Sequence, residues 1–194
     1  MRAWIEMISP DVADGKLAKL YEKARTPAGT VDNVMQAHSL RPHTMAGHVA
    51  LYRAVLHHPD NTLPDWFLEA VGSYTSILNG CDYSLTHHWH NARALLGGGE
   101  TGDAALAALD NREPEQAFEG KFLALLQYVE KLTLAPATIT QEDVDGLRTI
   151  GASDGEILET NQVCGYFNYV NRHLNGLGVS TEGDKIGYYD EPGS

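Results

Sequence analysis

Cys81, Ser84 and His88 have side chains that can do chemistry together. They follow one another at spacings of three and four, so on a helix with about 100° per residue they lie within roughly 60° of one another. Glu69 precedes the cysteine by twelve positions. A carboxylate, a thiol, a hydroxyl and an imidazole at these spacings can form one site for proton transfer or thiol chemistry.

Two helices joined by a tight turn must position these residues. Apolar residues recur at three and four across 65–78, an Asn-Gly pair stands at 79–80, and a second helix is expected over about 81–96. At about 1.5 Å per residue, an antiparallel hairpin places Glu69 roughly 15 Å and His88 roughly 12 Å from the turn. We therefore predict that Glu69 and His88 meet across the hairpin, directly or through a water molecule.

Cys81 is expected in the first turn of the second helix. Unpaired backbone N–H groups and the positive end of the helix dipole stabilise a thiolate there, so we expect a reactive cysteine. His87 points about 120° and His90 about 180° away from Cys81, which leaves only His88 facing the thiol. These histidines project in different directions, and no cofactor-binding motif is present. We expect neither a metal nor a cofactor.

The pattern Glu-x11-Cys-x2-Ser-x3-His resembles the alkylhydroperoxidase D and carboxymuconolactone decarboxylase superfamily, whose peroxidase members carry Glu-x11-Cys-x2-Cys-x3-His on a helical hairpin. The phrase Leu78-Asn79-Gly80-Cys81-Asp82-Tyr83 is typical of that hairpin. Segments 4–8, 30–34, 38–42 and 161–172 resemble the peroxidase-related branch, so the resemblance spans nearly the whole chain. It implies an all-α fold with a central antiparallel helical hairpin that carries the active-site motif.

Ser84 departs from that pattern. It stands where peroxidase members have their second cysteine, the thiol that attacks the hydroperoxide. The resemblance implies that Cys81 is the resolving partner and that Glu69 and His88 form the proton relay. A Cys-x2-Ser pair cannot close an internal disulfide. Turnover of hydroperoxides would therefore need an external thiol reductant, or Cys164 as a distant partner.

Three functions remain open at this point. The first is an antioxidant, peroxidase-related oxidoreductase that acts on hydroperoxides through Cys81, with weak or altered activity. The second is an acid–base enzyme of the carboxymuconolactone decarboxylase type, in which Glu69 and His88 move a proton on a small carbonyl or lactone and Tyr166 or Arg172 steadies an oxyanion. The third is a ligand-binding homo-oligomer without catalysis, in which Glu69 makes a buried structural pair with His88 or Arg172.

The remaining candidate site residues are those of a substrate pocket. A polar stripe on the last helix suggests a helix that lines a pocket or a subunit interface. The candidate pocket residues are Tyr74, Gln162, Tyr166 and Arg172.

Composition restricts the class of partner. The formal net charge is −12 and no Lys/Arg cluster occurs, so nucleic acids and anionic membranes would be repelled. No stretch approaches the roughly 20 apolar residues of a membrane span. Two cysteines are not a disulfide framework, and we expect a cytoplasmic protein that acts on a small molecule.

Amphipathic helices with many large apolar residues predict a homo-oligomer, and the resemblance implies trimers or hexamers.

The chain is expected to be all-α and to form one domain over residues 1–194. Outside the central hairpin, the expected helices are 11–25, 42–57, 103–110, 114–132, 141–150 and 154–175. Two capping boxes, at 140–143 and 153–156, open the last two of these helices. Residues 27–40 read as a loop, and residues 179–194 as a loosely structured C-terminal tail.

Overall fold

The computed structural model describes residues 1–189, and this part of the chain contains helices and no strand. In chain order the elements are α1 (Gly15–Lys23), α2 (Asn33–Gln36), α3 (Pro42–Leu56), α4 (Asp65–Leu78), α5 (Asp82–Leu95), α6 (Gly99–Asp110), the 3₁₀ helix η1 (Pro114–Gln116), α7 (Gly120–Leu134), the 3₁₀ helix η2 (Pro136–Thr138), α8 (Gln141–Thr149) and α9 (Asp154–Leu177). The all-α fold class is confirmed, as are both capping boxes, at Thr140 and Ser153.

Four expected elements differ from the structure. The predicted helix 11–25 is shorter, at Gly15–Lys23, and the predicted helix 103–110 begins four residues earlier, at Gly99. The predicted helix 114–132 is divided into η1 and α7, because the chain turns at Gly120, whose φ of 55° lies in the left-handed region that favours glycine. The predicted loop 27–40 contains the short helix α2. The backbone N–H at the start of α2 donates to the Asp184 carboxylate, 3.0 Å away, a partner about 150 residues along the chain. Local sequence patterns cannot reveal such a partner.

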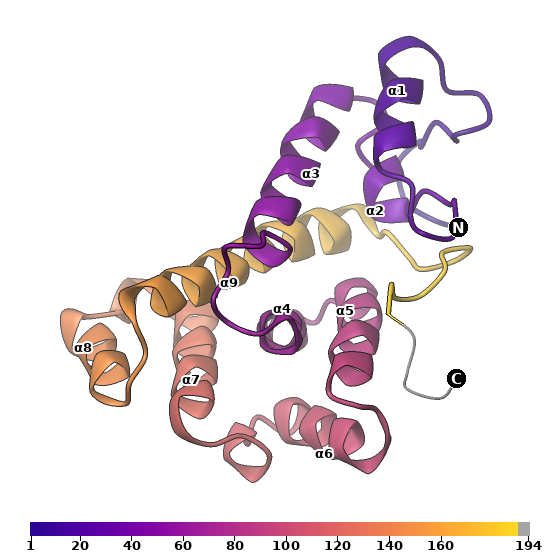
Figure 1. The fold of residues 1–194 in the computed structure, drawn as a ribbon. Helices are drawn as coiled ribbons and strands as arrows, with labels where there is room; N and C mark the ends of the chain where they lie inside the picture. Colours follow the sequence, from indigo (N-terminus) through magenta and orange to yellow (C-terminus); the bar gives the residue numbers. More distant parts are fainter. Residues whose placement is uncertain (190–194) are drawn as a thin grey trace.

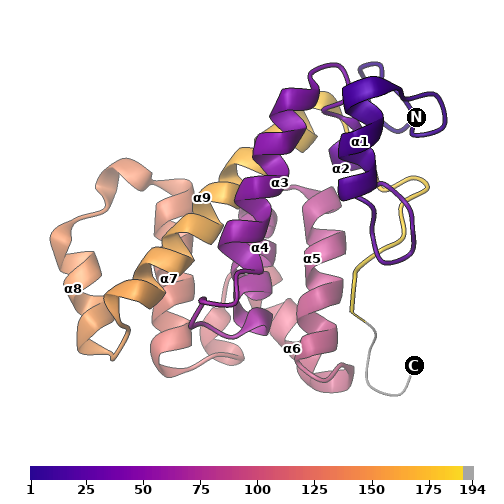
Figure 2. The ribbon, with the colours of Figure 1, turned by 45° about the horizontal axis from the view of Figure 1, so that its top comes forward.

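Helix α4 lies at the centre of the molecule, surrounded by α3, α5, α6, α7 and α9 (Figure 1, Figure 2). All its residues from Phe67 to Ser76 are buried. The hydroxyl groups of Ser73, Thr75 and Ser76 donate to backbone carbonyls four residues earlier, at 2.8 Å each. Glu69 has no such local partner for its carboxylate, so a partner must come from another helix.

Helices α4 and α9 approach closely at Gly72. A Cβ atom at this position would lie 2.3 Å from the ring of Phe167, so no larger residue fits without a shift. The Phe167 ring in turn meets the His88 imidazole edge to face, with ring centroids 4.6 Å apart and an interplanar angle of 90°. The glycine therefore allows the packing that holds one side of the His88 ring.

The chain after α9 runs beside α5 in both views (Figure 1, Figure 2). Residues 179–189 form no helix or strand, but they make specific hydrogen bonds to the rest of the chain. The Asp184 carboxylate accepts from the Tyr83 hydroxyl at 2.5 Å, and the Asn33 side chain donates to the carbonyl of Ser180 at 2.9 Å. Tyr188 is also bonded, through its backbone N–H, to the Asn91 side chain at 2.8 Å. The expectation for residues 190–194 lies outside the described residues.

Candidate functional site

Glu69 and His88 are in direct contact between α4 and α5. The Glu69 Oε2 atom lies 2.6 Å from His88 Nδ1, which confirms the predicted meeting of the two residues. The second carboxylate oxygen, Oε1, accepts from Asn91 Nδ2 at 3.2 Å. Glu69 is 1% exposed, so its charge is buried but both of its oxygens are hydrogen-bonded. The pair therefore meets the condition under which a buried carboxylate is tolerated.

This contact orients the imidazole. When the Glu69 carboxylate is ionised it can only accept, and the His88 Nδ1–H then donates to it. In the neutral ring the other nitrogen, Nε2, then keeps its lone pair and can take a proton. His88 lines a cavity and Glu69 stands behind it.

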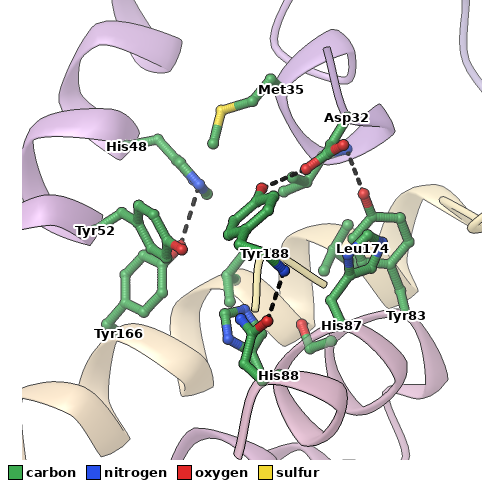
Figure 3. Close-up of a pocket in the computed structure, with 14 residues that line it drawn as sticks. Asp32, Met35, His48, Tyr52, Tyr83, His87, His88, Tyr166, Leu174 and Tyr188 are labelled. Atoms are coloured by element: carbon green, nitrogen blue, oxygen red, sulfur yellow. Dashed lines mark hydrogen bonds between the residues drawn. The ribbon is translucent and has the colours of Figure 1, made fainter. Parts of the chain in front are cut away.

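This inner cavity measures about 40 Å³ and is enclosed by residues of α2, α3, α5, α9 and the segment after α9 (Figure 3). The lining residues are Asp32, Val34, Met35, His48, Tyr52, Tyr83, Ser84, His87, His88, Asn91, Tyr166, Val170, Leu174 and Tyr188. Its volume is of the order of the ~30 Å³ share of one water molecule.

Cys81 is not among the residues that line the inner cavity. It is the N-cap of α5, is 1% exposed and carries a free thiol. Burial raises the pKa of the Cys81 thiol, and hydrogen bonds from Ser84 and Asn171 only partly oppose this effect. The expectation of a thiolate stabilised by the helix start is therefore wrong for this state of the protein, because desolvation outweighs the helix terminus.

Ser84 lines the inner cavity, one helical turn after Cys81. Cys164 lies elsewhere: its thiol is 3.3 Å from the Thr133 hydroxyl, and burial raises its pKa as well. Both cysteines are free. The structure therefore brings Glu69, His88 and Ser84 to one site and leaves Cys81 outside the lining of the cavity.

Of the four predicted pocket residues, Tyr166 lines the inner cavity and the other three do not. The Tyr74 hydroxyl donates to Glu130 at 2.7 Å, on another side of α4. Arg172 is exposed and donates to the carbonyl of Asn168 at 2.7 Å, so it is neither a pocket residue nor the partner of Glu69. Gln162 is exposed on α9. These corrections follow from the face of each helix that packs inward.

Sequence reasoning missed His87 and Asn91 as cavity residues. With Ser84 and His88 they form an i, i+3, i+4, i+7 stripe along α5. Angles measured from Cys81 excluded His87, whereas angles measured from Ser84 would have included it. The stripe could therefore have been found in the sequence if the angles had been measured from Ser84 instead of Cys81.

Tyr52 and His48 form the wall contributed by α3. The Tyr52 hydroxyl is buried and has no hydrogen-bond partner among the described residues, and its ring centroid is 6.3 Å from that of His88. Burial raises the pKa of Tyr52, so the phenol keeps its proton. The Tyr166 hydroxyl, by contrast, is bonded to His48 Nε2 at 3.1 Å. Tyr52 is therefore the free hydroxyl beside His88.

Two further findings concern residues 1–189. No three or more His, Cys, Asp or Glu side chains in this range are grouped so that they could hold a metal ion. No helix in this range is both long and apolar enough to cross a membrane.

Comparison with solved structures agrees with the fold. The chain superposes on an uncharacterised peroxidase-related protein from Silicibacter sp. TM1040 with a TM-score of 0.82 and 22% identity, over 98% of this chain and 95% of that chain. An alkylhydroperoxidase AhpD core protein from Ralstonia eutropha JMP134 gives 0.81 and 19% identity, over 93% of each chain. A variant of the debrominase Bmp8, in complex with 2,3,4-tribromopyrrole, gives 0.68 and 15% identity, over 94% of each chain.

No family model and no curated protein matches the sequence. The structural likenesses show that the chain has the alkylhydroperoxidase D-like fold, and the fold implied by the sequence resemblance is thereby confirmed. Proteins with this fold include a debrominase as well as peroxidase-related proteins, so the fold alone does not choose between reactions.

Proposed function

We propose that this protein is an acid–base enzyme in which the Glu69–His88 pair moves a proton on a small carbonyl or lactone substrate. The observation that carries the proposal is the 2.6 Å hydrogen bond between His88 Nδ1 and a buried carboxylate, in a histidine that lines the inner cavity and whose other ring nitrogen has no hydrogen bond among the described residues. The only thiol of the motif lies outside the cavity lining, and burial raises its pKa. Proton transfer needs neither a thiol nor a second substrate.

The inner cavity, at about 40 Å³, holds such a substrate only when the Tyr188 side chain that lines it moves away. The proposed step begins with a C–H bond next to the substrate carbonyl. His88 Nε2 takes the proton, and the electron pair of the C–H bond forms the enolate, whose charge rests on the carbonyl oxygen. The Tyr52 hydroxyl, which has no other partner among the described residues, donates to that oxygen. The imidazolium, stabilised by Glu69, then returns the proton. Atoms and electrons balance without an oxidant or a reductant.

Hydrogen–deuterium exchange tests this step. Small carbonyls and lactones are incubated with the protein in D₂O, and loss of the C–H signal is followed by NMR. We expect exchange that falls by about 10²-fold or more in His88→Gln and is reduced in Tyr52→Phe, since general base catalysis typically contributes 10²–10⁴-fold. Cys81→Ala is the matched control and should keep its activity. Exchange that persists in His88→Gln would overturn the proposal.

Hydroperoxide reduction through Cys81 is the second candidate. It is supported by the position of Cys81 one helical turn before Ser84, a cavity residue, and by the peroxidase-related structural neighbours. The Cys81 thiolate would attack the terminal oxygen, break the O–O bond, and form a sulfenic acid and an alcohol. Two external thiols would then regenerate Cys81, with release of water and formation of their disulfide. In this candidate Cys81→Ala abolishes activity.

Two free cysteines also support a reducing, cytoplasmic location.

A further inference from the structure

The inner cavity has a second polar wall, formed by Asp32 and His87. Asp32 is 3% exposed and His87 is 6% exposed. The Asp32 Oδ1 and His87 Nε2 atoms are buried and have no hydrogen-bond partner among the described residues. The nearest carboxylate oxygen to His87 Nε2, on Asp184, is 3.6 Å away, too far for a hydrogen bond. Unpartnered buried polar atoms are costly, and both of these belong to residues that line the inner cavity.

The side chain of Tyr188 already occupies this wall. Its hydroxyl donates to Asp32 Oδ2, and its backbone N–H donates to Asn91 (Figure 3). The residue as a whole remains 38% exposed, so its hydroxyl is bound while part of the residue faces solvent. The cavity therefore accommodates a hydrogen bond from a phenol hydroxyl to Asp32, and in this structure the phenol is the side chain of Tyr188.

Tyr188 also lines a second, larger cavity. An outer cavity of about 410 Å³ is lined by residues of α3, by the segment 24–27 and by Met35, Tyr52 and Tyr188, and these last three also line the inner cavity. The inner cavity alone, at about 40 Å³, cannot hold a ring. If the Tyr188 side chain moves away, the vacated space joins the two cavities and can receive a ring of the same size.

We propose that the site binds a small neutral phenol, whose ring and hydroxyl replace those of Tyr188 and whose hydroxyl donates to Asp32. The aromatic side chains of Tyr52, Tyr83 and Tyr166 line the cavity and suit a ring. Burial raises the pKa of Asp32, and an anionic ligand beside this carboxyl group would raise it further, so a neutral ligand is favoured. This inference names the class of ligand for the same site, and it therefore rests on the proposed function. A phenol is the enol form of a cyclic ketone, and the two forms interconvert by transfer of one proton between oxygen and carbon.

Calorimetric titration with 4-methylphenol tests the inference. We expect Tyr188→Ala to bind 4-methylphenol about tenfold or more tightly than the wild type, because the internal competitor is gone. Toluene, which lacks the hydroxyl, should bind that variant about tenfold or more weakly than 4-methylphenol. Adding Asp32→Asn to Tyr188→Ala should remove most of this preference. Tyr169→Ala, at an exposed tyrosine outside the inner cavity, is the matched control and should bind as the wild type does.

Two further variants complete the test. Tyr188→Phe removes only the hydroxyl and should also bind 4-methylphenol more tightly than the wild type, which covers a failure of Tyr188→Ala to fold. His88→Gln combined with Tyr188→Ala should keep the affinity, since binding is measured without turnover; the ligand class and the proton-transfer step therefore stand or fall separately. Equal affinity for toluene and 4-methylphenol, or no gain of affinity in either Tyr188 variant, would overturn the inference.

Discussion

Ser84 and Cys81 lie one helical turn apart on the same helix, yet only Ser84 reaches the inner cavity. In the peroxidase pattern that the sequence resembles, the thiol at the position of Ser84 attacks the hydroperoxide. In the structure, the motif position that lines the cavity is therefore the one that carries serine in place of the attacking thiol. The retained cysteine is 1% exposed and does not line the inner cavity. Proton transfer by Glu69 and His88 needs neither thiol.

Thiol reactivity should reflect this burial. Cys81 and Cys164 are 1% and 0% exposed, and burial raises the pKa of both thiols. We expect a thiol reagent such as dithionitrobenzoate to react with neither cysteine of the native protein within minutes at pH 7, and with both after unfolding in guanidinium. Rapid reaction of one thiol in the native protein, lost in Cys81→Ala, would instead show that Cys81 reaches the cavity.

The substitution Ser84→Cys should restore a thiol at the cavity wall. The new thiol would lie one helical turn from Cys81, a spacing at which Cys-x2-Cys pairs form disulfides. We expect the variant to form a reducible bond with Cys81 and to consume hydroperoxide with a dithiol reductant, while the parent protein shows little turnover. Ser84→Ala is the control. A variant that forms the disulfide but consumes no hydroperoxide would count against any peroxidase role for this site.

Removal of the buried carboxylate should destabilise the protein. Glu69→Ala leaves His88 and Asn91 without their acceptor, and loss of one partner of a buried pair costs about 3–5 kcal/mol. Glu69→Gln keeps one acceptor oxygen and should cost about 1–3 kcal/mol. Urea unfolding measures both values, with the exposed Glu115→Ala as a control expected within about 0.5 kcal/mol of the wild type. Equal stability of Glu69→Ala and the wild type would contradict the pairing.

The buried histidines should make the protein sensitive to acid. Burial, together with neighbouring histidines, lowers the pKa of His38 to about 4 and that of His48 to about 3, and burial lowers the pKa of His173. The unfolded chain, with histidine pKa values of about 6.5, binds more protons than the folded protein between these limits. Stability should therefore be complete above about pH 6.5 and fall as the pH drops toward 4.

The expected slope is at most about 1.4 kcal/mol per pH unit for each histidine. Urea midpoints measured from pH 7 to pH 4.5 give this slope, and His38→Gln should reduce it. The exposed His58→Gln serves as the control and should leave it unchanged. A midpoint that stays constant across this range would show that the buried histidines take up protons without cost.

The exposed apolar side chains support the prediction of a homo-oligomer. Trp4 is 74% exposed, Leu158 56%, Ile150 52% and Leu134 50%. Side chains of this size are expected to be covered by association. Sedimentation equilibrium at micromolar concentration should give a trimer or a hexamer, with a mass three or six times that of the 21.2 kDa chain. A species with the mass of a single chain would refute the prediction.

Local sequence determined the hairpin and its central contact. Glu69 and His88 belong to two helices joined by a short turn, so their heights follow from the rise per residue and their directions from the 100° rotation. The two capping boxes were readable for the same reason, because every atom involved lies within four residues. The helical periodicity of the sequence also places the α5 residues that line the cavity, from Ser84 onward, on one face of the helix.

Only the tertiary structure decided the rest of the site. Asp32 and Tyr188 are 156 positions apart, and their hydrogen bond depends on how the chain returns after α9, which no periodic pattern specifies. The burial of Cys81 depends likewise on α9, whose Asn171 packs against the thiol. Local geometry fixes which face of a helix a side chain occupies. The packing of distant segments fixes whether that face meets solvent, a cavity or another helix, and with it the chemistry that the side chain can do.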